Sequence, residues 1–545
     1  MKNKIIFLSL LLIIPFMIKA KDIEPEWIKG FGGRSGDRYE HIVQTDDGGY
    51  VVVGSTESGD FEDLYTNGMC DGLIVKYDEN GNIVWKNNWG GSGINMFKSA
   101  ITTEDDGIIV VGSFAHGNIP PGLETSESNG AIIIKYDKDG NMLWQKSPGG
   151  NSYEDFYSVV ALENGDFIVA GGSRSTNIEG LPNKGDYDAV IIKYDKDGNI
   201  IWQKSWGGNN SDQFYSITLA STGDIYAAGT SRSTDIEGLT NRGSSDSIIV
   251  KFDKDGNMLW QNILGGNGSY DEFYSAIVSD DNSVIVVGRT DSTNIQGLTN
   301  RGSQDGTIVK YDKDGNMLWQ KNWGGKKSDF FYDVAWINEN EFAAVGSSSS
   351  TDIEGIENIE NLSMVIVIFD KDGNVVWNKN YFNSDWGTLN AIQQTKDKNF
   401  IVVGSTYSDL EDRPNKGAAD AIILKYYTKY EVENTIVDDT KGVTTVEQQG
   451  TKGIITPQPN EGYEVDQIIV KDNEGNILDV EVTKLEDGTY SFPLYTNVSI
   501  EVTYKEKISN PKTGILDVLA IIFIGFVMSL CGFILVKRYN ERYEI

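Results

Sequence analysis

The side chains that most often perform catalysis are scarce in this chain of 545 residues. There are two histidines, His41 and His116, and two cysteines. A Ser–His–Asp triad or a zinc site built on several histidines is therefore not indicated. The 80 acidic residues could supply a carboxylate pair for glycoside hydrolysis, but no pair stands out from the rest of the sequence.

A recurring Asp-Lys-Asp-Gly-Asn segment is the best candidate for metal chemistry. It begins at residues 137, 195, 253, 312 and 370 and resembles the start of a calcium loop. The segment lacks the glutamate at position twelve that completes an EF-hand loop. Hairpin turns, in which Gly and Asn accept positive φ, are the better explanation, and weak calcium binding is the alternative. The calcium ligands would then include Asp137, Asp139, Asp195 and Asp197. No other cofactor is expected.

Four tyrosines at one position of a repeated segment are the best candidates for binding a ligand. They are Tyr157, Tyr215, Tyr274 and Tyr332. On a face rich in loops they could form a ring of platforms on which sugars stack. Packing between neighbouring repeats is the simpler alternative.

These residues belong to a repeat of 58 or 59 residues, marked by one tryptophan in each copy. Residues 156–206 contain four strand-like runs rich in Val, Ile, Tyr and Trp. Tight turns join the first pair and the last pair, and a long loop joins the two pairs. Four antiparallel strands connected in this way make one blade of a β-propeller. The marker residues are Trp27, Trp85, Trp144, Trp202, Trp260, Trp319 and Trp377.

The phase of the repeat predicts a closed ring of seven blades. Strands one to three occur seven times between Tyr39 and Tyr427, but no Trp strand follows the last set. The missing strand lies at the N-terminus, around Trp27. An N-terminal strand can complete the last blade and pair the exposed edges, whereas a linear array has no use for it. We therefore predict an all-β fold in which residues 22–428 form a seven-bladed propeller of four-stranded blades.

The repeats resemble extracellular bacterial β-propeller repeats, which are distantly related in architecture to kelch and WD40 propellers. The set Tyr136, Asp137, Asp139, Gly140, Asn141 and Trp144 is also similar to the tryptophan-docking motif of quinoprotein propellers, with an Asp-to-Trp spacing shorter by one residue. This similarity implies that the repeated tryptophans act as wedges between blades.

Targeting signals and charge predict an exported protein. Residues 1–20 combine Lys2, Lys4, an apolar run and Ala20, as in a secretory signal peptide. Cys70 is alone in the exported part, because Cys531 lies in a C-terminal apolar segment, so no intramolecular disulfide is expected. The net charge of −33 argues against nucleic acid as a partner, since phosphate binding needs clustered Lys and Arg. We expect a monomer.

A different β pattern covers residues 433–506, with runs such as GYEVDQIIV, NILDVEVTKL and NVSIEVTYK. It resembles the small β modules, similar to divergent internalin-type B repeats, that occur on Gram-positive surface proteins. The resemblance implies a stalk, and a second binding module is the alternative.

The C-terminal segment carries the most specific motif. Within residues 507–514 the order is Asn510, Pro511, Lys512, Thr513 and Gly514; an apolar stretch (515–536) and a basic tail (537–545) follow. This order resembles the LPXTG sorting signal. The resemblance implies that a sortase cleaves after Thr513 and joins its carbonyl to a peptidoglycan amine, so that the apolar helix spans the membrane only before sorting and the tail is cytoplasmic. Asn510 stands where the family usually has Leu.

Together these features predict a non-catalytic, cell-wall-anchored Gram-positive surface protein, most simply an adhesin whose propeller binds an extracellular glycan or protein. The alternatives are a structural spacer and an extracellular enzyme, either glycan-active or quinone-dependent. A plain transmembrane tail is the alternative to wall sorting.

Overall fold

The computed structural model describes residues 22–60, 64–66, 68–118, 120–125, 129–356, 361–381, 385–410, 414–435 and 438–507. The expected signal peptide, the motif Asn510–Gly514 and the expected membrane span lie outside these residues. Within the described part, no helix is long and apolar enough to cross a membrane. The chain divides into two units after Lys429, and each is described by itself.

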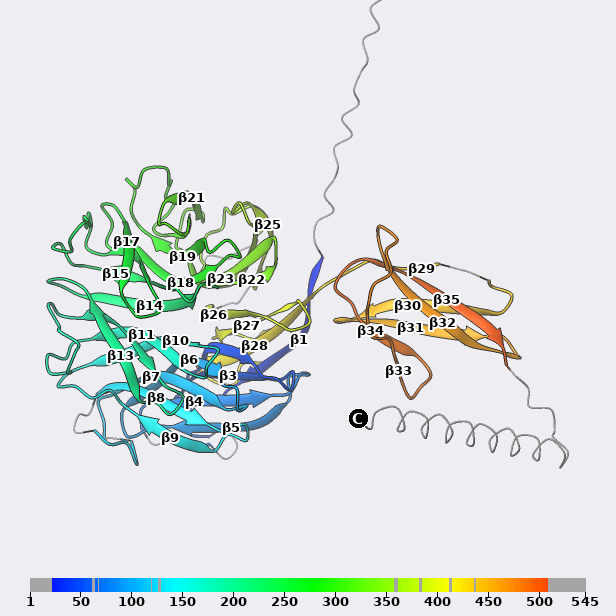
Figure 1. The fold of residues 1–545 in the computed structure, drawn as a ribbon, viewed down its shortest axis with the longest axis horizontal. Coiled ribbons are helices and arrows are strands. Elements are labelled where there is room, and N and C mark those ends of the chain that lie inside the picture. Colours follow the sequence, from blue (N-terminus) through cyan, green and yellow to red (C-terminus); the bar gives the residue numbers. More distant parts are fainter. Residues whose placement is uncertain are drawn as a thin grey trace, which may run out of the picture. The chain divides into compact units, whose positions relative to one another are not determined.

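Seven four-stranded antiparallel sheets make up the first unit, and they follow one another around a ring (Figure 1). Blade 1 contains β2 (Asp37–Gln44), β3 (Tyr50–Thr56), β4 (Asp71–Tyr77) and β5 (Ile83–Trp89). Blade 2 contains β6 (Ile94–Thr102), β7 (Ile108–Ala115), β8 (Gly130–Tyr136) and β9 (Met142–Lys146). Blade 3 contains β10 (Glu154–Ala161), β11 (Phe167–Ser173), β12 (Asp188–Tyr194) and β13 (Ile200–Trp206). Blade 4 contains β14 (Asp212–Leu219), β15 (Ile225–Ser231), β16 (Asp246–Phe252) and β17 (Met258–Leu264).

The remaining blades follow the same plan. Blade 5 contains β18 (Glu272–Val278), β19 (Val284–Thr290), β20 (Asp305–Tyr311) and β21 (Met317–Trp323). Blade 6 contains β22 (Asp329–Asn338), β23 (Glu341–Ser348), β24 (Ser363–Asp370) and β25 (Val375–Tyr381). Blade 7 contains β26 (Gly387–Gln394), β27 (Phe400–Thr406), β28 (Asp420–Thr428) and, from the N-terminus, β1 (Ile23–Phe31). The predicted seven-bladed propeller is therefore confirmed.

Ring closure is made by β1, which pairs antiparallel with β28 from Ile23 opposite Thr428 to Phe31 opposite Ala421. A buried ion pair reinforces this pairing. The ammonium of Lys425, whose side chain is 7% exposed, lies 3.0 Å from Glu26 on β1 and 2.9 Å from Asp397 in the β26–β27 turn. Because a buried charge without a partner is costly, loss of either carboxylate would destabilise this blade.

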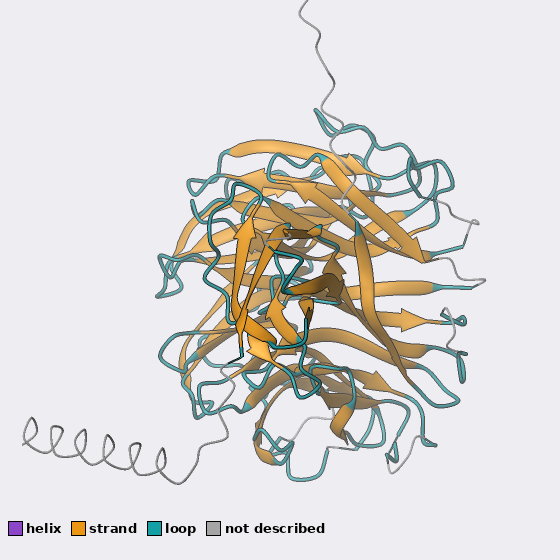
Figure 2. Cartoon of the chain, turned by 90° about the vertical axis from the view of Figure 1, so that its right-hand side faces the viewer, coloured by secondary structure: helices purple, strands orange, loops and turns teal. Residues whose placement is uncertain are grey.

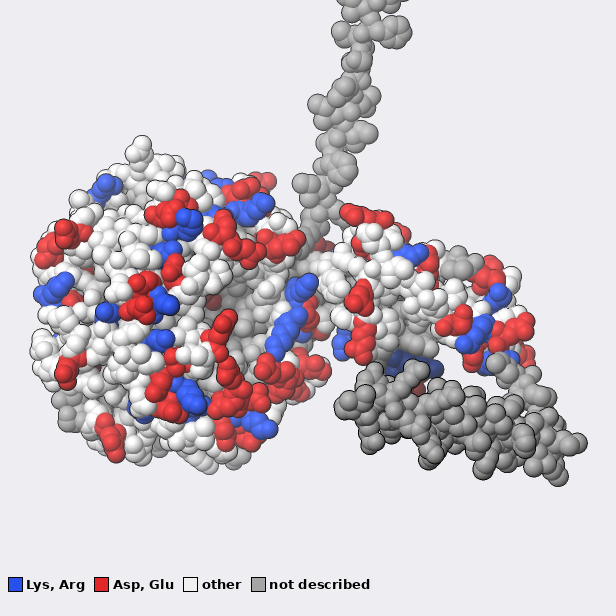
Figure 3. All heavy atoms as spheres, viewed as in Figure 1, with Lys and Arg blue, Asp and Glu red and all other residues white. Residues whose placement is uncertain are grey.

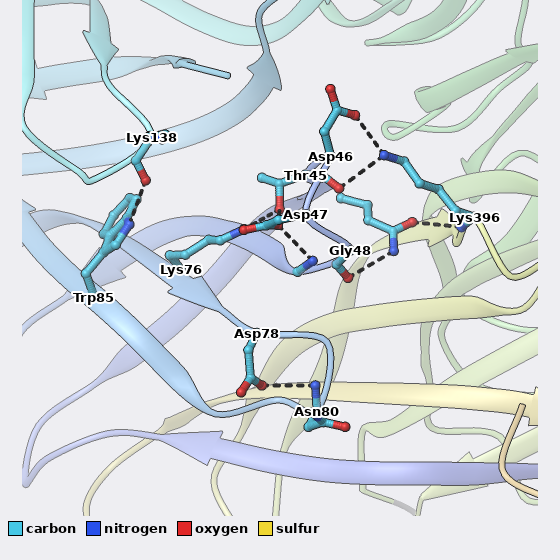
Figure 4. A network of polar contacts seen from close by, with 12 residues as sticks. Thr45, Asp46, Asp47, Gly48, Lys76, Asp78, Asn80, Trp85, Lys138 and Lys396 are labelled. Atoms are coloured by element: carbon cyan, nitrogen blue, oxygen red, sulfur yellow. Dashed lines mark hydrogen bonds and ion pairs between the residues drawn. The ribbon is translucent and has the colours of Figure 1, made fainter. Parts of the chain in front are cut away.

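Turn residues add polar contacts across the joint between blade 7 and blade 1 (Figure 4). Lys396 Nζ donates to Asp46 Oδ1 at 2.7 Å and to the Thr45 carbonyl at 3.2 Å. The Lys396 backbone N–H donates to Gln44 Oε1 at 2.7 Å. The Lys396–Asp46 pair is exposed, so its own contribution to stability is small.

The first strands of neighbouring blades contact each other all the way round, which makes them the inner wall of the ring. Each of these strands contains a β-bulge directly after a buried aromatic or leucine residue that recurs in every blade, for example between Phe214 and Ser216. The bulge brings the preceding carbonyl against the glycine on the second strand. A Cβ on Gly229 would lie 1.9 Å from the Gln213 carbonyl oxygen. The same contact explains why glycine recurs here in all seven blades: Gly54, Gly112, Gly171, Gly229, Gly288, Gly346 and Gly404.

The marker tryptophans lie on the outer strands, where their rings are half-buried. Six of the seven pack against the turn glycine of the next blade, as Trp85 packs on Gly140. Glycine is required there twice over, because its φ is +83° and a Cβ would lie 2.8 Å from the Trp85 ring. In two joints the indole N–H also reaches across: Trp85 Nε1 donates to the Lys138 carbonyl at 3.0 Å (Figure 4), and Trp260 Nε1 to that of Lys313. Trp377 has no such turn to meet, because β1 replaces the fourth strand of blade 7.

The second unit contains strands and loops only, as does the rest of the described chain (Figure 2). One sheet has the order β29-β35-β32 and the other β30-β31-β34-β33. The strands are β29 (Val432–Thr435), β30 (Gly442–Gln449), β31 (Lys452–Pro459), β32 (Tyr463–Asp472), β33 (Thr483–Lys484), β34 (Tyr490–Pro493) and β35 (Val498–Glu506). The predicted small β domain is thus present.

One expected strand of this unit is mostly absent. The run NILDVEVTKL forms regular strand only at Thr483–Lys484. Its alternate side chains Leu478, Val480 and Val482 do pack against the core. The alternation therefore predicted burial correctly, but between Ile477, which forms an isolated bridge with Lys471, and Thr483 the backbone forms no regular strand.

We predict that Gly229→Ala destabilises the protein by about 3 kcal/mol or more, because the methyl group would overlap the Gln213 carbonyl. Thermal unfolding of residues 22–507 measures the effect. Gly30→Ala is the matched control, since its new Cβ would lie 4.0 Å from the nearest atom, the Ala421 carbonyl oxygen. Equal melting temperatures for the two variants would contradict the role of the bulge.

Candidate ligand-binding mouth of the ring

The end of the ring where the first strands begin is called the mouth here. The connections between blades arrive at this end, and the long loops between second and third strands leave from it. One residue per first strand is left out of register by the bulge, and bulges commonly re-aim side chains near functional sites. These residues are Glu40, Lys98, Tyr157, Tyr215, Tyr274, Tyr332 and Asn390.

The four tyrosines singled out from the sequence occupy four consecutive bulges. Their rings touch in series: Tyr157 and Tyr215 have centroids 5.2 Å apart, and the next two pairs, ending at Tyr332, are each 5.6 Å apart. Burial raises the pKa of all four phenols, so they are neutral at physiological pH. The rings therefore do pack between blades, as the simpler alternative held, but they are only half-buried and form one aromatic arc.

An ion pair lies beside this arc and was not singled out from the sequence. Arg289, directly after the bulge glycine of blade 5, lies 2.6 Å from the Glu272 carboxylate, which also accepts a hydrogen bond from the Tyr274 hydroxyl. The Arg289 guanidinium stacks over the rings of Tyr270, Tyr274 and Phe330 at 5.0–5.6 Å. Other blades have Ser, Thr or Gly at the Arg289 position, so departure from the repeat is the signal that could have found it.

The other side of the mouth is polar. Lys98 Nζ lies 3.3 Å from Glu40 Oε1, and Asn390 Nδ2 donates to the Tyr39 carbonyl at 2.8 Å. Burial raises the pKa of Asp155, beside the first tyrosine of the arc. The mouth is thus asymmetric, aromatic over blades 3 to 6 and polar over blades 7, 1 and 2.

Buried carboxylates hold the connections between blades in place. Asp212 accepts hydrogen bonds from the Gly208 backbone N–H at 2.8 Å and the Ser233 hydroxyl at 2.7 Å, and also from Ser231. Asp37, Asp271 and Asp329 do the same in their blades. Neither the carboxylates nor their Ser/Thr partners were singled out from the sequence, although both recur with the repeat. These hydrogen bonds therefore fix the backbone at the start of the mouth loops.

The residues considered for metal binding have structural roles. Asp137 uses both carboxylate oxygens inside its own turn, accepting from the backbone N–H groups of Asp139 and Asn141 and from the Asn141 side chain. Asp195 does the same within the next turn, which includes Asp197. Among the described residues, no group of three or more His, Cys, Asp or Glu side chains is placed to hold a metal ion.

The two histidines lie in different local environments and do not form a catalytic site together. His41 lies within β2 and accepts a long hydrogen bond from the Ala100 backbone N–H at 3.4 Å. Burial lowers the pKa of His41 to about 4, so the ring is neutral at physiological pH. His116 lies in a loop and contacts the Tyr153 ring.

Charge does not mark out a single site on the surface seen in Figure 3. Acidic and basic side chains are interspersed over the visible face of the propeller. On this face the acidic side chains are thus accompanied by basic ones, which favours solubility over a focused field.

Comparison with known proteins supports a propeller built of repeats. A family model described as outer membrane protein assembly factor BamB matches residues 70–289, less than half of the chain. A regulatory protein FlaEY of Caulobacter vibrioides is 24% identical over 211 residues, 35% of this chain and 22% of that protein. An uncharacterized WD repeat-containing protein L264 of Acanthamoeba polyphaga mimivirus is 27% identical over 176 residues, 28% of this chain and 13% of that protein. The matched segments are thus less than a quarter of each relative's length.

The solved structures similar to this chain include the WD40 domain of Neurospora crassa Pan2. The likeness covers 75% of this chain and 97% of that domain, with 9% identity and a TM-score of 0.42.

We predict that His41→Ser changes how stability depends on pH. The folded pKa of about 4 lies below the ordinary value of 6.5, so the unfolded chain binds the proton more readily. The contribution of His41 to the free energy of unfolding is therefore fully present above pH 6.5. It falls by about 1–3 kcal/mol as the pH drops towards 4. Serine, which four other blades carry here, removes this loss. Melting temperatures of both proteins between pH 7.5 and 4.5 test this, and parallel profiles would contradict it.

Proposed function

We propose that this protein is a non-catalytic, cell-wall-anchored surface protein whose propeller binds an extracellular protein with its mouth. The observation that carries the binding proposal is the cluster of Arg289, Glu272 and Tyr274 among further aromatic rings. Tyrosine and arginine are the residue types most enriched at the energetic centres of protein interfaces. Because the Arg289 side chain is stacked and paired before any ligand arrives, little conformational entropy would be lost on binding.

The proposed location depends on the chain ends. The signal-peptide pattern of residues 1–20 supports export, and the order from Asn510 to Gly514, followed by an apolar stretch and a basic tail, supports sorting by a sortase. Thr513 would then be joined to peptidoglycan. The β domain of residues 433–506 would act as the stalk between the wall and the propeller.

We predict that Arg289→Ser strongly weakens ligand binding without unfolding the protein, since Ser is the residue of blades 1, 2, 6 and 7 at this position. Residues 22–507 are used to probe an array of extracellular-matrix and bacterial envelope proteins, and hits are measured by biolayer interferometry. Loss of a hot-spot arginine is expected to weaken binding about 30-fold or more.

Lys138→Ser is the matched control, because Lys138 lies in a hairpin turn at the end of the ring away from the mouth. Retained binding by Arg289→Ser would contradict the proposed site. Chemical turnover of a bound ligand would contradict the non-catalytic part of the proposal.

For the anchor, we predict that Thr513→Ala prevents attachment to the wall. In a Gram-positive host with its own sortases, muramidase is expected to release the wild-type protein and detergent to leave it behind. In the variant the sortase would no longer recognise the residue whose carbonyl it attacks. The variant should therefore be extracted by detergent alone. Detergent extraction of the wild-type protein would show a membrane anchor instead.

A further inference from the structure

A glutamine at one position of the outer strand ties two neighbouring blades together. In blade 2, Gln145 Oε1 accepts the indole N–H of Trp89 from blade 1 at 2.8 Å, and its Nε2 donates to the Pro121 carbonyl of its own blade at 2.8 Å. In blade 4, Gln261 accepts from Trp206 at 2.8 Å and donates to the Glu237 carbonyl at 2.7 Å. Each of these indoles is thereby satisfied.

Blade 6 departs from this pattern, because the position holds Asn378, whose side chain is one methylene shorter. Asn378 Nδ2 still approaches its own loop, but its distance to the Glu354 carbonyl is 3.4 Å. The facing indole belongs to Trp323 of blade 5, which is only 6% exposed. Among the described residues, no acceptor lies within hydrogen-bond distance of Trp323 Nε1. Trp323 Nε1 is nevertheless not one of the buried side-chain atoms that lack a partner, so its N–H opens to solvent at this joint and is available to a ligand.

A groove of about 780 Å³ lies at this joint between blades 5 and 6, and both Trp323 and Asn378 line it. Its outer lip is apolar: Val375 and Val376 are 47% and 40% exposed, and Trp377 beside them is half-buried. Two basic and two acidic side chains complete the wall, so the lining has no net charge: Arg301, Lys321, Asp352 and Glu354.

We propose that this groove binds a neutral oligosaccharide. Its volume is in the range of about 300–1,000 Å³ typical of small-molecule sites. A sugar hydroxyl would accept the hydrogen bond from Trp323 Nε1, and other hydroxyls would donate to the acidic side chains of the wall. The apolar face of a sugar ring would lie against Trp377 and the two valines. The balanced charge of the wall favours a neutral ligand over a charged peptide.

The groove includes residues 352–355 of one mouth loop, but it shares no residue with the Arg289 cluster and does not rest on the function proposed for that cluster. Trp323 is at the end of the outer strand of blade 5, whereas Arg289 is beside the inner strand of that blade. Loss of one site should therefore leave the other unchanged.

The test is the substitution Asn378→Gln, which gives blade 6 the residue of blades 2 to 5. Residues 22–507 labelled with ¹⁵N-tryptophan are titrated with chitotriose, cellotriose and maltotriose, and the indole signal of Trp323 is identified with Trp323→Phe. We expect at least one of these sugars to shift that signal saturably. In Asn378→Gln the affinity should fall at least tenfold, with an unchanged or higher melting temperature because the indole gains its acceptor.

Gln320→Asn is the matched control, because the facing position in blade 4 is Leu264, which has no N–H to satisfy. This control and Arg289→Ser should both bind the sugar like wild type. If none of the three sugars shifts the Trp323 signal, or if Asn378→Gln binds as well as wild type, the proposal is wrong. Occupation of the groove by a charged peptide in preference to these sugars would also overturn it.

Discussion

The pairing of β1 with β28 is the constraint on which the rest of the molecule depends. It joins residues about 400 positions apart in the sequence and turns a row of similar sheets into a ring. Only a closed ring gives every first strand two neighbours. Only then does the bulged residue of blade 7 reach the first strand of blade 1, as Asn390 does when it donates to the Tyr39 carbonyl. Lys425 lies at this seam with two carboxylate partners, so the closing strand is held by charge as well as by backbone hydrogen bonds.

Within the closed ring, the residues that recur in every blade make the fold rigid. The residues that differ between blades are the candidates for ligand binding. The bulge and its facing glycine recur because backbone geometry demands them, and the turn glycine recurs because a tryptophan of the preceding blade packs on it. Positions that the backbone does not constrain are free to differ between blades. The tyrosine arc, Arg289 and Asn378 are all such departures, and each gives one sector of the ring a property that the others lack.

The architecture could be predicted from the sequence because its signals are local and repeated seven times. The tryptophan spacing, the turn sequences and the phase of the copies together require the strand exchange that β1 makes. Contacts between blades could not be predicted so well. That Gln145 reaches Trp89, or that Arg289 stacks on three aromatic rings, depends on side chains brought together by the ring and separated in the sequence. In the second unit, the alternation of apolar and polar residues in NILDVEVTKL (476–485) showed which side chains are buried. It did not show whether this backbone forms a regular strand.

Ring closure is tested most directly by hydrogen exchange of blade 7 in a protein that lacks residues 22–33. If β1 completes the blade, backbone amides of β28 should exchange at least 100-fold faster than in the intact protein, because their partners are gone. Amides of blade 4, on the far side of the ring, should be affected much less, and a synthetic peptide of residues 22–33 should restore the protection of β28. Unchanged exchange in β28 after the deletion would contradict the account.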